Sequence, residues 1–132
     1  SYSAGATTYS TVLTATINNV EASSRIIGFV NVQGAIDAAG GDIALYVFEG
    51  SRVMGTGDTP SGTPGTILEL RHSMTALHGS AQFVDASPPT GTVNYVLKMI
   101  NENTVTLGHY GNDTDIRFPR VHQSLILMEV SA

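Results

Sequence analysis

Short segments with the character of β-strands, each ended by turn-forming residues, recur along the whole chain and constrain its fold more than any other feature. The segments are rich in β-branched and aromatic residues, which favour strands. We expect about nine of them, at residues 11–17, 24–33, 42–49, 51–56, 66–72, 76–85, 92–100, 104–110 and 122–130. Gly, Pro, Ser and Asn separate them, and signals for helices are almost absent. The sequence therefore predicts an all-β domain, folded as an antiparallel sandwich or barrel.

The length of 132 residues suits one domain with a proper hydrophobic core. We expect an N-terminal arm at residues 1–10, followed by a single β domain at residues 11–132. The stretch 55–65 reads GTGDTPSGTPG and is expected to be an exposed loop. Its neighbours at 49–50 are expected to form a tight turn that pairs segment 51–56 with the strand before it.

Several of the expected strands are apolar on both faces. In segment 43–48, Tyr46 and Phe48 lie on the face opposite Ile43 and Val47. A sandwich that meets water on its outer faces alternates apolar and polar residues, so a second apolar face needs a cover. Another subunit would supply that cover, and a long loop of the same chain is the alternative.

The charge of the chain is low and scattered. Charged residues make up 13% of the sequence and the net charge is −5, against a usual charged share of about 25%. Six Lys and Arg residues form no basic stripe, which argues against nucleic-acid partners and against attachment to a membrane surface. Scarce charge with abundant Gly and Thr favours a surface that meets other protein subunits, although hydroxyl-rich strand faces alone would give the same composition.

The sequence contains no arrangement of residues typical of catalysis or of cofactor binding. The absence of cysteine excludes disulfides, thiolate metal sites and cysteine nucleophiles. The four histidines, at positions 72, 78, 109 and 122, lack the spacing of metal ligands. Asn112, Asp113 and Asp115 could offer oxygen ligands to calcium, but they lack the complete loop pattern and are interpreted as a turn. We therefore expect neither an enzyme nor a protein with a metal or cofactor.

One segment is more specific than the rest. Residues 85–97 read DASPPTGTVNYVL and resemble a signature of Asp, Pro-Pro, Gly, Tyr and Leu found in jelly-roll domains of tailed-phage virion proteins. In this signature the proline pair stiffens a corner and Gly91 turns it, while Tyr95 and Leu97 enter the core. The strands at 26–32 and 43–47 and the closing strand at 123–130 resemble the same family, so that the likeness covers residues 10–130.

The resemblance implies a jelly-roll sandwich of about eight to nine antiparallel strands that forms a homotrimer of the TNF or C1q type. It implies a capsid decoration protein that lies on the outer surface of a phage head, is made in the host cytoplasm and binds the major capsid protein. No signal peptide is visible at the N-terminus, in keeping with that expectation. The expected trimer-interface residues are Tyr46, Phe48, Val96, Ile126 and Met128, and Tyr2 and Tyr9 of the arm are expected to contact the capsid.

A second hypothesis belongs to a different class of function. The same trimer could be a receptor- or glycan-binding domain of a tail fibre or head fibre that presents its loops to a cell surface. The absence of Trp lowers the expectation of a sugar-stacking platform without removing it.

Overall fold

A computed structural model describes residues 9–36, 41–55, 57–58, 64–72, 76–101, 105–107 and 123–131. These residues form ten strands and no helix, which confirms the all-β class. The strands are β1 (Ser10–Val20), β2 (Arg25–Ile36), β3 (Gly41–Glu49), β4 (Arg52–Val53), β5 (Gly57–Asp58), β6 (Pro64–His72), β7 (Ala76–Asp85), β8 (Gly91–Asn101), β9 (Val105–Leu107) and β10 (Ser124–Val130).

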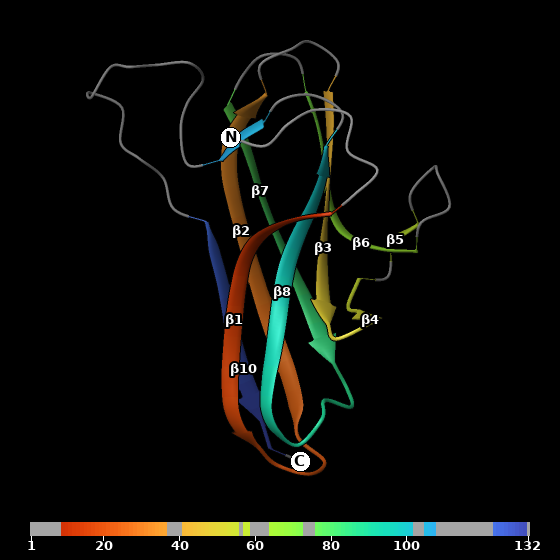
Figure 1. Cartoon of the computed structure of the whole chain (residues 1–132), viewed down its shortest axis with the longest axis vertical. Helices are drawn as coiled ribbons and strands as arrows, with labels where there is room; N and C mark the ends of the chain where they lie inside the picture. The colour runs from red at the N-terminus through yellow and green to blue at the C-terminus, as the bar shows by residue number, and fades with distance from the viewer. Residues whose placement is uncertain are drawn as a thin grey trace, which may run out of the picture.

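The strands make two antiparallel sheets that face each other (Figure 1). The front sheet has the order β1-β8-β3-β6-β5, with β4 paired to β3. The back sheet has the order β10-β2-β7, with β9 paired to the end of β2. Along one side of the sandwich β1 lies against β10, and along the other side β6 lies against β7.

The pairing of the strands is nested. β1 pairs with β8, β2 with β7 and β3 with β6, so each earlier strand meets a correspondingly later one. A long antiparallel ribbon that wraps around a core produces this pattern, and β3 closes the front sheet by pairing with β8 as well. The chain is therefore wound as a jelly roll, as the sequence led us to expect.

The core lies between the sheets and is built from the inward side chains of the alternating strands. Its fully buried members are Tyr95, Ile26, Ile43, Leu45, Leu97, Met99, Val30, Val32, Val47 and Val93. Tyr46 is also buried, but it lies on the outer face of the front sheet. Tyr95 and Leu97 are buried as predicted, and Gly91 has a left-handed φ of 89° at the start of β8.

Two details differ from the expectation based on sequence. The expected loop at 55–65 contains β5, which pairs with β6 at Gly57 and Thr66. β4 is shorter than the predicted segment 51–56, although it does pair back on β3 through a turn at Gly50, whose φ is 56°. Residues 1–8 of the predicted arm lie outside the described part of the chain, and β1 begins at Ser10.

Candidate functional site

The outer face of the back sheet carries a cluster of apolar side chains. The antiparallel registers place Met128, Ile27 and Val84 side by side across β10, β2 and β7. Ile126 and Phe29 form the next row, and Val130 continues the face along β10. We call the six residues Ile27, Phe29, Val84, Ile126, Met128 and Val130 the apolar face.

Five of these side chains are exposed to solvent in the single chain, and Ile27 is half-buried. Ile126 is 58% exposed, Val84 56% and Met128 47%, and Phe29 and Val130 are each 41% exposed. Apolar residues that are exposed singly are ordinary, but a contiguous apolar patch marks a surface that binds something. The apolar face is therefore the first candidate interaction site.

A hollow of about 570 Å³ opens next to the apolar face. Phe29 and Ile126 line it on one side, and Val30 and Ala81 also line it. Its polar lining consists of the neutral residues Asn31, Ser80, Gln82 and Ser124. The Ser80 hydroxyl donates a hydrogen bond to the Asn31 side-chain oxygen over 3.3 Å. Neutral donors and acceptors beside an aromatic ring suit an uncharged polar ligand.

The outer face of the front sheet carries an aromatic cluster, which we define as Tyr9, Tyr46, Phe48 and Lys98. The Tyr9 ring stands edge-on to the rings of Tyr46 and Phe48, with 5.1 Å between centroids in each case. The Lys98 amine lies 4.6 Å from the centroid of the Phe48 ring, a cation–π contact. Partial burial, and then the nearby Tyr46, raises the pKa of Tyr9 above its ordinary value.

The aromatic cluster shows what covers Tyr46. That ring is only 2% exposed, and the residue that packs edge-on against it, Tyr9, comes from the same chain. Tyr9 itself is 39% exposed. The second apolar face of β3 is therefore covered in part from within the chain, by a residue predicted to contact the capsid.

The structure divides the five predicted trimer-interface residues between two surfaces. Tyr46, Phe48 and Val96 lie on the outer face of the front sheet, where Phe48 and Val96 are direct cross-strand partners. Ile126 and Met128 lie on the apolar face, on the opposite side of the sandwich. Tyr2 lies outside the described residues.

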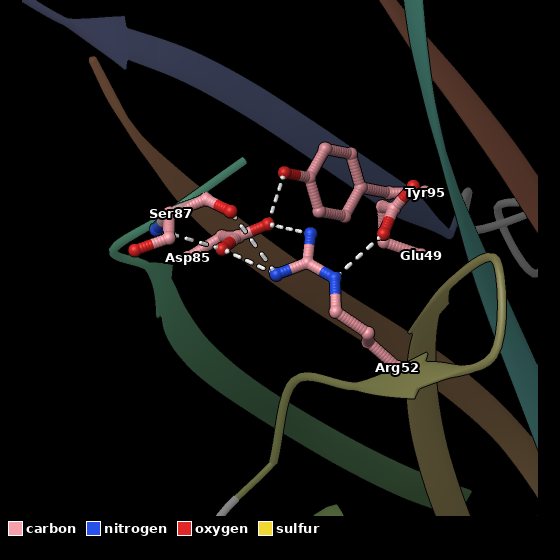
Figure 2. Close-up of polar contacts among 5 residues, drawn as sticks. All are labelled: Glu49, Arg52, Asp85, Ser87 and Tyr95. Carbon is pink, nitrogen blue, oxygen red and sulfur yellow. Dashed lines mark hydrogen bonds and ion pairs between the residues drawn. The ribbon is translucent and has the colours of Figure 1, made fainter. Parts of the chain in front are cut away.

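A polar network ties the two sheets together at the β7–β8 corner (Figure 2). Arg52 donates to both carboxylate oxygens of Asp85, at 3.1 and 2.8 Å, and to Glu49 at 2.8 Å. The Tyr95 hydroxyl donates to Asp85 at 2.8 Å, and the Ser87 backbone N–H donates to it at 3.1 Å. Asp85 comes from the back sheet, whereas Arg52 and Tyr95 come from the front sheet.

The hydrogen bonds of this network set the protonation state of its members. Burial alone would raise the pKa of Asp85, but the bonds from Arg52, Tyr95 and Ser87 outweigh it and hold the pKa below its ordinary value. Burial, and then the bond to Asp85, raises the pKa of Tyr95. Tyr95 is 0% exposed and the Asp85 side chain is 3% exposed, whereas the Arg52 side chain is 40% exposed.

Sequence reasoning missed part of each site. Ile27, Phe29 and Val84 were not among the predicted interface residues, although Ile27 and Phe29 alternate with the buried Ile26 and Val30. That two-sided alternation was the available signal. The pairing of Arg52 with Asp85 had no signal in the sequence, because the two residues meet only when the sheets face each other.

The histidines and one acidic turn were the other residues considered as possible metal ligands. Within it, no group of three or more His, Asp and Glu residues gathers in a way that could hold a metal ion. His78 is exposed, and the side chain of His72 is not described. His109, His122 and the turn with Asn112, Asp113 and Asp115 lie outside the described residues. No helix suited to crossing a membrane occurs among the described residues.

Comparison of the chain with models of known protein families and with curated protein sequences finds no match. We therefore infer the function from the apolar face and the hollow beside it.

Proposed function

We propose that the chain is a structural subunit of a protein assembly, of the capsid-decoration type, and that it binds its protein partner through the apolar face. The observation that carries the proposal is the exposure of five large apolar side chains on one face, from 41% to 58%. The cores of stable protein interfaces are apolar and poor in charge. The two rows of the apolar face at Ile27 and Phe29 contain no charged residue, and Arg25 lies opposite Val130 at the end of the face.

The resemblance of residues 85–97 to virion jelly rolls supports the narrower form of the proposal. In that form the partner is the major capsid protein and the chain lies on the outer surface of the head. A subunit that binds only the assembled lattice stabilises that lattice by mass action. No catalytic step is part of the proposal.

The homotrimer implied by the resemblance is part of this proposal. Phe48 and Val96 are half-buried and lie side by side on the front sheet, so they are the members of the predicted set best placed for a threefold contact. The apolar face on the other sheet would then remain available to the capsid.

Co-sedimentation with undecorated, expanded phage heads tests the proposal. We expect the unmodified chain to bind, and Ile126→Lys and Val84→Lys each to weaken binding by roughly tenfold or more, because each places a charge in an apolar contact. Ala22→Lys adds the same charge at an exposed turn and serves as the matched control. Unchanged binding by both face variants, with their fold intact by circular dichroism, would contradict the proposal.

The hollow supports a second candidate function, the recognition of a glycan by a fibre domain. Its neutral amides and hydroxyls could bond sugar hydroxyls while the Phe29 ring packs against the apolar side of a sugar ring. A glycan array distinguishes the two candidates. Specific glycan binding that Phe29→Ala abolishes would favour the fibre domain. The absence of binding to every glycan on the array would favour the capsid-decoration function.

A further inference from the structure

Strand β10 lies at the margin of the back sheet, beside β1 (Figure 1). Among the strands that the structure describes, β10 pairs along one edge only, with β2. Its other edge therefore presents a row of backbone N–H and C=O groups. Such an edge is a template for a further strand, and proteins usually protect it.

β1 lies beside β10, but β10 itself lacks the basic residues, prolines and bulges that protect many edge strands. Its sequence, SLILMEV, contains no Lys, Arg or Pro. Its register with β2 runs without a bulge from Ser124 to Val130. By contrast, β1 has two shifts in its register with β8, and the edge strand β7 carries outward polar residues, with His78, Ser80 and Gln82 all exposed. The edge of β10 is thus both regular and apolar.

We propose that two copies of the chain pair antiparallel along β10 and join their back sheets into one continuous sheet. An antiparallel pair of identical strands is self-complementary about a twofold axis, so a second copy meets the requirements of this edge. Outward side chains face one another across such a pair, and Ile126, Met128 and Val130 would meet residues of their own kind. Glu129, the single charged residue of β10, lies on the face of the strand opposite these side chains, and its carboxylate accepts a hydrogen bond from the Glu21 N–H at 2.9 Å within its own chain.

The pairing goes beyond the proposed function and does not depend on it. It places two apolar faces on the same side of one extended sheet, which doubles the apolar area offered to a partner. It also leaves the aromatic cluster free, since that cluster lies on the other sheet. A threefold contact through Phe48 and a twofold contact through β10 could then coexist and link neighbouring trimers.

Sedimentation velocity of the purified full chain over a dilution series tests the pairing with a matched pair of variants. Ile126 and Val84 are exposed to nearly the same extent, 58% and 56%, on the same face but on opposite edge strands. We expect Ile126→Lys to weaken self-association by roughly tenfold or more, and Val84→Lys to leave it within about twofold of the unmodified chain. Equal effects of the two variants would overturn the proposal.

Disulfide trapping gives a second, independent measurement, because the chain has no cysteine of its own. We expect the double variant Ile126→Cys/Met128→Cys to form a covalent dimer on mild oxidation, since directly opposed residues of an antiparallel pair lie within reach of a disulfide. The control is Gln82→Cys/Val84→Cys on β7. Cross-linking of the β10 variant no faster than this control would overturn the pairing. Failure of the unmodified chain to bind phage heads would contradict the proposed function and leave the β10 pairing unaffected.

Discussion

At the scale of single residues, the Asp85 carboxylate accepts four hydrogen bonds. The donors are Arg52, Tyr95 and the Ser87 N–H, which between them come from three separate parts of the chain. The Asp85 side chain is 3% exposed, whereas that of Arg52 is 40% exposed. A buried carboxylate is tolerated when all of its acceptor positions are used, and the loss of the carboxylate leaves its donors unpaired.

We predict that Asp85→Asn lowers the free energy of unfolding at neutral pH by about 2 kcal/mol, because the charged hydrogen bonds with Arg52 are lost. The prediction extends to pH. The folded pKa of Asp85 lies below the unfolded value of about 3.9, so the stabilisation is present above about pH 4 and is lost as pH falls through the folded pKa. Urea unfolding over this range should therefore show a steeper decline for the unmodified chain than for Asp85→Asn.

Tyr95→Phe is the control for this prediction. It removes one hydroxyl but leaves Arg52 and Asp85 paired, so it should cost about 1 kcal/mol and preserve most of the acid dependence. Parallel pH curves for the unmodified chain and Asp85→Asn would contradict the role given to the carboxylate.

At the scale of strands, the β2–β7 pair depends on a close approach at one position. Gly28 lies directly opposite Phe83, and a Cβ atom on Gly28 would come within 2.0 Å of the Phe83 ring. That ring is 4% exposed and lies 5.5 Å from the Tyr95 ring between the sheets. Glycine in the middle of β2 is thus required by the space that an aromatic side chain of the neighbouring strand occupies.

We predict that Gly28→Ala destabilises the fold by about 3 kcal/mol, since the added methyl group must push Phe83 out of its place in the core. Gly91→Ala is the comparison, because no atom lies within 4 Å of its added Cβ and only the left-handed φ of 89° opposes it. That strain should cost about 1 kcal/mol. Thermal and urea unfolding check the order, and a smaller loss for Gly28→Ala than for Gly91→Ala would contradict it.

At the scale of the whole molecule, the chain has few charges and an apolar face that contains none. Because only 13% of the residues are charged, few ion pairs can form across a contact surface of the molecule. Association with a partner through the apolar face, or with a second copy along β10, should therefore depend on apolar burial and backbone hydrogen bonds more than on ion pairs.

We predict that self-association of the chain does not weaken as sodium chloride rises from about 0.01 to 1 M, a range in which the Debye length falls from about 30 to about 3 Å and the repulsion between two chains of net charge −5 is screened. Sulfate at equal ionic strength should strengthen it, because excluded salts favour the burial of apolar surface. Sedimentation in both salts checks the prediction. A dissociation constant that rises steeply with sodium chloride would show that charge pairs drive the contact.

Much of the fold could be predicted from local features of the sequence. Alternating β-branched residues in segments such as 11–17 and 92–100 indicated strands, and the glycines at 50 and 91 indicated turns that the structure confirms at positive φ. The buried positions of Tyr95 and Leu97 were also predicted. These features depend on neighbours within a few residues, so the sequence records them directly.

Only the tertiary structure decided how the faces of the strands are distributed. The sequence determined that β3, β8 and β10 are apolar on both sides, but it could not say that Phe48 and Ile126 belong to opposite surfaces or that Tyr9 packs against Tyr46. It also could not bring Arg52 to Asp85, 33 positions away. The physical reason is the same in each case: alternation specifies two sides of a strand, whereas the sheet that a strand joins and the layer that covers it depend on contacts between residues far apart in the chain.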